Sequence, residues 1–88
     1  MPAIILSQEA TDLLKAERKK FEPYAEKGWL CEGGEHGDIT CNVFFNNDTD
    51  EFFRADYNGN ILYNALKGTS LSDAKEMAKI YGKIMTIR

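Results

Sequence analysis

The fold is decided by residues 39–66, which read ITCNVFFNNDTDEFFRADYNGNILYNAL. Apolar and polar residues alternate through three parts of this stretch, and a period of two is typical of β-strands with one buried face. Residues 46–50 and Asn58-Gly59-Asn60 separate the three parts. Because Asn and Gly tolerate the positive φ angles that tight hairpins need, these separators predict turns. The stretch therefore predicts three antiparallel strands joined in chain order.

The pairing of these strands determines which side chains share a face. A five-residue loop at 46–50 places Val43 opposite Phe53 and Cys41 opposite Ala55, and residues 29–31 add a short strand with the same alternation. The pairing predicts one apolar face of odd-numbered residues: Trp29, Cys31, Ile39, Cys41, Val43, Phe45, Phe53, Ala55, Tyr57, Ile61, Tyr63 and Ala65. A slip of one residue would bury the polar set instead, so we expect this odd face to carry the core.

A helix is predicted before the strands, from Ser7 to Lys27. Ser7 is a suitable N-cap residue, and Gly28 is a natural stop. Apolar residues recur at helical spacing on one side: Ala10, Leu13, Leu14, Phe21 and Tyr24. Pro23 is expected to kink this helix or to end it early, because proline lacks the backbone N–H and clashes with the preceding turn.

A second helix is predicted after the strands. Residues 70–73 fit the Asp form of a capping box, and an apolar stripe follows them. Gly82 is able to end this helix. In that case residues 84–87 would be extended and would pair with residues 3–6 as an extra strand.

The order of elements predicts an α+β fold. An N-terminal and a C-terminal helix flank a three- or four-stranded antiparallel meander in two layers, in the order α-β-β-β-β-α. With 88 residues the chain has room for one core, so residues 1–88 are expected to form a single compact domain. Apolar content of 43% and charged content of 28% are typical of folded globular domains.

The charge of the chain is unevenly distributed. The 14 acidic residues exceed the 11 Lys and Arg residues, giving a net charge of −3. Residues 32–56 contain seven acids and only one base, a net charge of −6, which leaves +3 for the remainder of the chain. An acidic sheet region suits a protein partner with a basic surface, such as a nucleic-acid-binding protein. It counts against direct binding of this chain to nucleic acid.

The even-numbered side of the predicted sheet is the candidate binding surface. If both helices cover the odd side, apolar even-numbered residues remain exposed, and an apolar patch with a polar rim is typical of protein interaction sites. The predicted partner-binding residues are Phe44, Phe52, Leu62, Asp48, Asp50, Glu51, Arg54 and Asp56. The first three would bury against the partner, and the charged residues would form the rim.

These features favour a small acidic protein-binding module, for example a stoichiometric inhibitor that occludes its target. Phage-encoded inhibitors, including anti-CRISPR proteins, and immunity proteins or antitoxins have a similar size and charge. The chain would act as a monomer or as a homodimer through the same face. We expect no enzyme activity and no cofactor, because the sequence holds no recognisable catalytic motif. The longest early apolar run is too short to span a membrane or to direct export, so the expected location is the cytoplasm of the source cell or a host.

Two alternatives stay open. With three strands, the order helix-strand-strand-strand-helix resembles that of double-stranded RNA-binding domains at the level of topology. A nucleic-acid-binding module of this αβββα order would use basic helix residues: Lys15, Arg18, Lys19, Lys75, Lys79 and Lys83. The second alternative is a small zinc-binding protein. Four residues separate Cys31 from His36 and His36 from Cys41, which matches the last three ligands of a zinc knuckle, whereas the missing first ligand falls at Gly28. Buried, unreactive thiols explain the two cysteines equally well.

Overall fold

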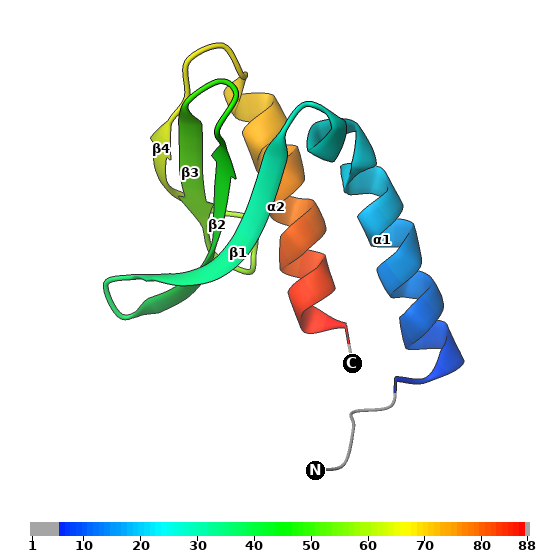
Figure 1. The fold of residues 1–88 in the computed structure, drawn as a ribbon. Helices are drawn as coiled ribbons and strands as arrows, with labels where there is room; N and C mark the ends of the chain where they lie inside the picture. The colour runs from blue at the N-terminus through cyan, green and yellow to red at the C-terminus, as the bar shows by residue number, and fades with distance from the viewer. Residues whose placement is uncertain (1–5, 88) are drawn as a thin grey trace.

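The computed structural model of the chain describes residues 6–87 and contains two helices and one sheet (Figure 1). The elements are α1 (Gln8–Glu26), β1 (Trp29–His36), β2 (Ile39–Asn46), β3 (Glu51–Ala55), β4 (Ile61–Ala65) and α2 (Leu71–Thr86). The four strands are antiparallel and lie in chain order, β1-β2-β3-β4. This α-β-β-β-β-α arrangement confirms the predicted fold class.

Both helices begin at the predicted serine caps. The Ser7 hydroxyl accepts a hydrogen bond from the backbone N–H of Ala10, and the Ser70 hydroxyl accepts one from Asp73. These bonds satisfy N–H groups that have no partner within the first helical turn. Pro23 lies inside α1, which continues to Glu26, so the expectation of an early end was wrong. Near the end of a helix, proline removes only one backbone hydrogen bond.

The end of α2 also differs from one of the expectations. The helix continues through Gly82 to Thr86, so residues 84–86 are helical rather than extended. A Cβ atom at Gly82 would lie 2.4 Å from the backbone oxygen of Tyr57, which shows that α2 packs directly against the turn between β3 and β4. Glycine therefore permits this close approach instead of ending the helix. Of the predicted extra strand at residues 3–6, residues 3–5 lie outside the described range and Leu6 is not in a strand.

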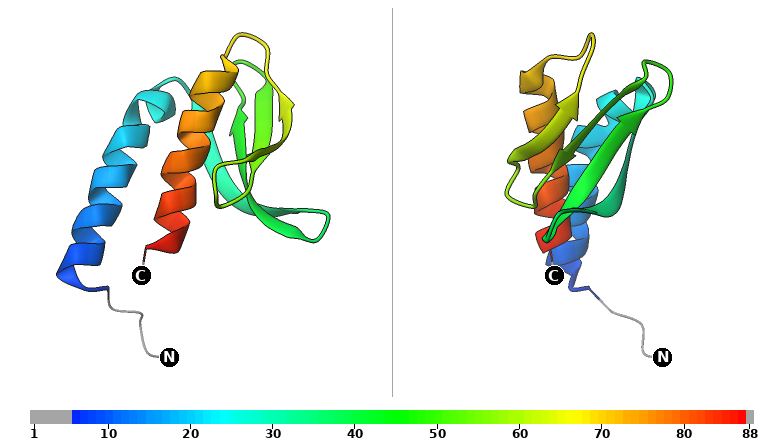
Figure 2. Two further views of the ribbon diagram at one scale, coloured as in Figure 1. Left: turned by 180° about the vertical axis from the view of Figure 1, so that it is seen from behind. Right: turned by 90° about the vertical axis from the view of Figure 1, so that its left-hand side faces the viewer.

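The two helices lie on the same side of the sheet (Figures 1 and 2). Helix α2 packs across the sheet against β2 and β4, while α1 packs against α2 and β1. We call the side of the sheet that meets the helices the covered face. Within residues 6–87 no helix lies on the other side, which we call the open face (Figure 1).

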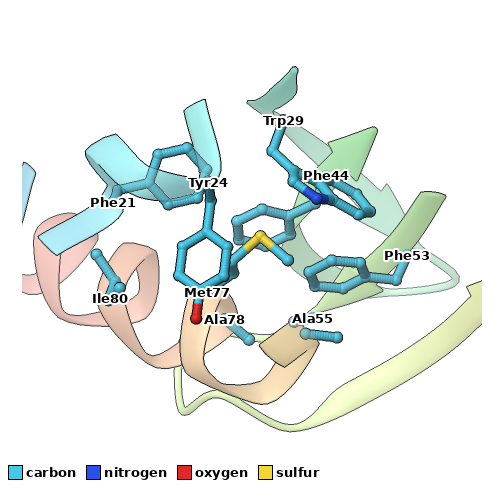
Figure 3. Close-up of a cluster of buried hydrophobic side chains, with 10 residues drawn as sticks. Phe21, Tyr24, Trp29, Phe44, Phe53, Ala55, Met77, Ala78 and Ile80 are labelled. Carbon is cyan, nitrogen blue, oxygen red and sulfur yellow. The ribbon is translucent and has the colours of Figure 1, made fainter. Parts of the chain in front are cut away.

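The core between the helices and the covered face is largely aromatic. The rings of Phe44 and Phe53 are stacked with their centroids 4.5 Å apart, and Trp29 meets Phe53 edge-on at 5.5 Å. Figure 3 shows Met77 of α2 directed toward these rings. Phe21 of α1 joins the same cluster, which therefore connects both helices to the sheet. Burial of such large side chains is the main source of stability for a domain of this size.

The register of β2 differs by one residue from the prediction. Asn46 belongs to β2 and pairs with Glu51, so the loop contains only residues 47–50, and it closes with Asp50 at a φ of 58°. Phe44 consequently pairs with Phe53 on the covered face, whereas Val43 and Phe45 point to the open face. The predicted odd-numbered core was therefore wrong for β2, because one extra residue in a strand exchanges its two faces.

The pairing of β4 with β3 also differs from the prediction. Ala55 pairs with Ile61 but Arg54 pairs with Tyr63, so the register shifts at Leu62. Ile61 packs against the core, while Tyr63 lies on the open face beside Phe52. The expectation that Tyr63 belongs to the core was therefore wrong. A bulge of this kind turns the residues that follow it and increases the local twist of the strand.

Candidate functional site

A continuous row of apolar residues crosses the open face of the sheet. Leu30 pairs with Phe45, Phe45 with Phe52, and Phe52 with Ala65, so the row takes one residue from each strand. With neighbouring strands about 4.8 Å apart, the row extends for about 14 Å. Leu30 is 52% exposed. Phe45 and Phe52 are half-buried, although no helix within residues 6–87 covers them. We call this set the open-face row.

A second row, mixed in character, lies beside the first. Val43 pairs with Glu32 on one side and with Arg54 on the other, and Arg54 pairs with Tyr63. Tyr63 is 48% exposed, and its ring lies 5.1 Å from that of Phe52, which joins the two rows. The open face therefore combines an apolar centre with polar groups at its margin, as protein interaction sites commonly do.

Arg54 is held against the open face by a backbone contact. Its guanidinium donates a hydrogen bond to the backbone oxygen of Glu35 in β1, so the side chain reaches across β2. Gly34 leaves room for this arrangement, because a Cβ atom there would lie 2.7 Å from a methyl group of Val43. Arg54 is thus preorganised, which lowers the entropy cost of using it in a contact.

Acidic groups flank the open face at both ends. Asp48 and Asp50 are exposed in the loop between β2 and β3, and Glu35 and Asp38 are exposed at the tip of the β1–β2 hairpin. The ammonium group of Lys67 lies 2.6 Å from Asp50, and this hydrogen bond and charge hold the pKa of Asp50 below its ordinary value. These four residues are four of the seven acids in residues 32–56.

Two of the predicted partner-binding residues are buried, which corrects their assignment. Phe44 is fully buried in the core because β2 has the other register. Glu51 is 3% exposed, and its carboxylate accepts hydrogen bonds from the backbone N–H of Lys67 and from the N–H and hydroxyl of Thr69. Burial alone would raise the pKa of Glu51, but hydrogen bonds from Lys67, Thr49 and Thr69 lower it to about 2. Glu51 therefore fixes the segment before α2 and is no rim residue.

The remaining predicted residues lie in several different environments. Phe52 and Arg54 are on the open face, and Asp48 and Asp50 are exposed at its edge. Leu62 is half-buried at the register shift in β4. Asp56 organises the β3–β4 turn, because its carboxylate accepts hydrogen bonds from the N–H groups of Asn58 and Asn60 and from the Asn60 side chain.

Sequence reasoning missed five apolar open-face residues: Leu30, Val43, Phe45, Tyr63 and Ala65. The available signal was Asn46 followed by Asp48 and Thr49. The Asn46 side-chain oxygen accepts hydrogen bonds from the N–H groups of both, and its amide donates to the backbone oxygen of Lys27. An Asn that bonds the backbone two residues later is a known turn former, and it places the strand end at Asn46 itself.

The three candidate zinc ligands do not form a metal site. Within residues 6–87, no three His, Cys, Asp or Glu side chains are grouped so that they could hold a metal ion. Cys31 and Cys41 are free thiols, and His36 is exposed near the tip of the β1–β2 hairpin. Burial, with smaller contributions from Glu32 and Cys41, raises the pKa of Cys31 to about 12. A thiol with such a pKa is a poor nucleophile and a poor metal ligand.

No protein-family model, curated protein sequence or solved structure matches this chain. Among residues 6–87, neither helix is long and apolar enough to cross a membrane.

Proposed function

We propose that this chain is a protein-binding module that docks onto a partner through the open face of its sheet. The observation that carries the proposal is the open-face row, in which Leu30, Phe45, Phe52 and Ala65 lie in register across all four strands. Large apolar side chains gain about 1.5 to 3 kcal/mol each on full burial, so an exposed row of this kind favours association.

The orientation of β2 supports this interpretation. Its covered side carries two asparagines, Asn42 and Asn46, beside Phe44, while its open side carries Val43 and Phe45. The more continuously apolar side of this strand therefore faces outward. Departures from simple burial patterns are expected where a surface serves binding as well as folding.

The charges around the row favour a particular kind of partner. Asp48, Asp50, Glu35 and Asp38 flank the apolar centre, so a fitting surface would be apolar with basic residues around it. Proteins that bind nucleic acid carry such basic surfaces, and occlusion of one would make this chain a stoichiometric inhibitor of the phage, immunity or antitoxin type. A reducing compartment such as the cytoplasm suits the free thiols of Cys31 and Cys41.

The experiment is affinity capture from the source organism or its host with the full chain and two double variants. Phe45→Ser/Phe52→Ser removes the centre of the open-face row. Leu13→Ser/Met85→Ser is the matched control, because both residues are exposed apolar side chains on the helices. We expect at least one protein that the native chain and the control retain and that Phe45→Ser/Phe52→Ser loses.

Equal capture by the two double variants would contradict the proposal, provided circular dichroism shows that both are folded. Sedimentation equilibrium of the native chain tests whether the partner is a second copy of this chain. Self-association that only Phe45→Ser/Phe52→Ser abolishes would make a second copy the partner.

A further inference from the structure

A shallow groove runs along the other side of β4, between that strand and α2. Its lining includes Asn58, Asn60, Asn64, Leu71, Lys75 and Lys79. Asn64 pairs with Phe53 and so lies on the helix side of β4, whereas its neighbour Tyr63 lies on the open face. The groove is therefore a surface distinct from the open-face row.

The groove is lined by two lysines that form no ion pair within residues 6–87, although Glu76 lies near both on α2. Lys75 and Lys79 are one helical turn apart on α2, and both are exposed. Among residues 6–87 neither forms an ion pair, whereas Lys20, Lys67 and Lys83 each do. The amide groups of Asn58 and Asn64 line the same groove. Unpaired ammonium groups and amide donors together favour a ligand that carries carboxylate or phosphate groups.

One edge of β4 adjoins the groove, and no strand within residues 6–87 pairs with it. β4 is the last strand of the sheet, and residues 60–66 contain neither charge nor proline. The other edge strand, β1, carries Glu32 and Glu35, which discourage pairing. Natural proteins usually protect an edge strand with charges, proline, a β-bulge or a covering element. The register shift at Leu62 disturbs the first part of β4, but residues 63–65 pair regularly with β3 and carry no charge, so this part of the edge is a template for another strand.

We propose that β4 binds an extended acidic segment of another protein by strand addition. The backbone of the segment would pair with the free edge of β4. Its side chains on the helix side would be carboxylates that meet Lys75 and Lys79, and the alternate side chains would be apolar and lie beside Tyr63, since side chains of a strand alternate between its faces. This inference goes beyond the proposed function, because it concerns the free edge and the helix side of β4 and a different kind of ligand. The two surfaces adjoin at Tyr63, whose ring lies 5.1 Å from that of Phe52.

The same charges disfavour a second copy of this chain as the occupant. Antiparallel pairing of two β4 strands about a twofold axis would keep both α2 helices on one side of the joined sheet. Lys75 and Lys79 of one copy would then approach those of the other, and β4 itself has no charge to neutralise them. Juxtaposed like charges at an interface oppose association.

The test measures binding of a fluorescent peptide of alternating Glu and Val to the full chain by fluorescence anisotropy. About eight residues are enough to span β4. We expect this peptide to bind, and a peptide of alternating Lys and Val not to bind. Lys75→Glu/Lys79→Glu should weaken binding by about tenfold or more. Lys15→Glu/Lys19→Glu is the matched control, with the same charge change on α1, and should retain most of the affinity.

Strand addition is separated from simple charge attraction by the peptide backbone. N-methylation of one alternate set of peptide residues should abolish binding and N-methylation of the other set should be tolerated, because only one set of N–H groups faces β4. Binding should also slow hydrogen exchange of amides in β4. Tolerance of both methylated peptides, unchanged exchange in β4, or tighter binding of an RNA oligonucleotide to the same groove would overturn the proposal.

The two surfaces can fail separately. Leu30→Ser/Phe45→Ser, in the half of the open-face row formed by β1 and β2, should leave the affinity for the acidic peptide unchanged. Lys75→Glu/Lys79→Glu should leave capture through the open face unchanged. Self-association of the native chain that protects β4 amides without any peptide would overturn the assignment of the occupant and identify a second copy instead.

Discussion

The covered and open faces of the sheet are built from the same strands, and each contains a pair of phenylalanines. On the covered face, Phe44 pairs with Phe53 and both are fully buried under α2. On the open face, Phe45 pairs with Phe52, and both remain half-buried. Similar residues thus stabilise the fold on one side and stay available for contact on the other. The helices, rather than the residue types, make this difference.

The two faces also differ in how they treat polar groups. The covered face ends in Asn46 and Glu51, which are buried and hydrogen-bonded, whereas the buried amide nitrogen of Asn42 has no hydrogen-bond partner within residues 6–87. The acids on and around the open face are exposed, both in strand β1 and in the loops. Buried polar groups that are satisfied specify a single arrangement of the chain, whereas exposed charges mainly influence association.

The largest expected effect tests the contrast between neighbouring residues of β2. Phe44→Ala should lower the free energy of unfolding by about 3 to 5 kcal/mol, because it leaves a cavity in the core. Phe45→Ala should lower it by about 1 kcal/mol or less, because Phe45 is already partly in water. Urea unfolding of both variants provides the measurement. Equal losses of unfolding free energy in the two variants would mean that Phe45 on the open face is as well packed as Phe44 on the covered face.

A smaller effect is expected from the buried carboxylate at the end of the covered face. Because the pKa of Glu51 falls from 4.5 to about 2 on folding, its ionisation contributes about 3 kcal/mol of stability. This contribution is present above pH 4.5 and is lost as the pH falls toward 2. Glu51→Gln should therefore be less stable at neutral pH and less sensitive to acid, as measured by unfolding between pH 2 and 7.

The control for Glu51 is Asp48→Asn, an exposed carboxylate in the adjoining loop. It should leave the stability at neutral pH nearly unchanged. An acid transition in Glu51→Gln as steep as that of the native chain would show that other carboxylates are responsible.

Replacement of Asn46 by alanine should lower the free energy of unfolding by about 2 kcal/mol. The substitution removes one donor and one acceptor and leaves the backbone oxygen of Lys27 without that bond. Asn47→Ala, at the exposed neighbouring position, should cost much less. Thermal unfolding of the pair provides the comparison. A small loss at Asn46 would mean that the β2 register, and with it the open-face row, depends on packing alone.

Local signals in the sequence were sufficient to predict the helices and strands, but not to predict which face of the sheet each side chain occupies. The serine caps and the Asn58-Gly59 turn act within a few residues, so they could be recognised directly. The boundary of β2 depends on Asn46, which bonds the nearby backbone of Asp48 and Thr49 and also the backbone oxygen of Lys27, 19 residues away. The local bonds are a turn signal, but the contact with Lys27 is not. No period in the sequence reveals such a contact.

The candidate site was accordingly predicted only in part. Phe52 and Arg54 could be assigned to the outer side because β3 has the expected orientation. Phe44 and Phe45 exchanged places with the register of β2, and Tyr63 moved outward with the shift at Leu62. When odd-numbered and even-numbered positions of a strand are both apolar, the alternation does not show which side is buried. For β2, the assignment of Asn46 to the strand or to the loop therefore determined which side faces the helices.

The smallest expected effect concerns the helices that cover one face only. Glu17 of α1 is buried, whereas Leu13, which the apolar spacing assigned to the packed side of the helix, is exposed. The Glu17 carboxylate lies 3.0 Å from the ammonium group of Lys20 and 3.1 Å from that of Lys83 in α2. Burial opposes its charge, but these two lysines hold its pKa below the ordinary value.

Glu17→Gln should therefore lower stability by about 1 kcal/mol near neutral pH, and the difference from the native chain should shrink as the pH falls below 4.5. A double-mutant cycle with Lys83→Met measures the coupling between the helices. Because the ion pair joins α1 to α2 and does not touch the sheet, the variant should bind any open-face partner normally. A loss of that binding together with a small loss of stability would mean that the helix pair also controls the shape of the open face, and the two faces would then be coupled rather than separate.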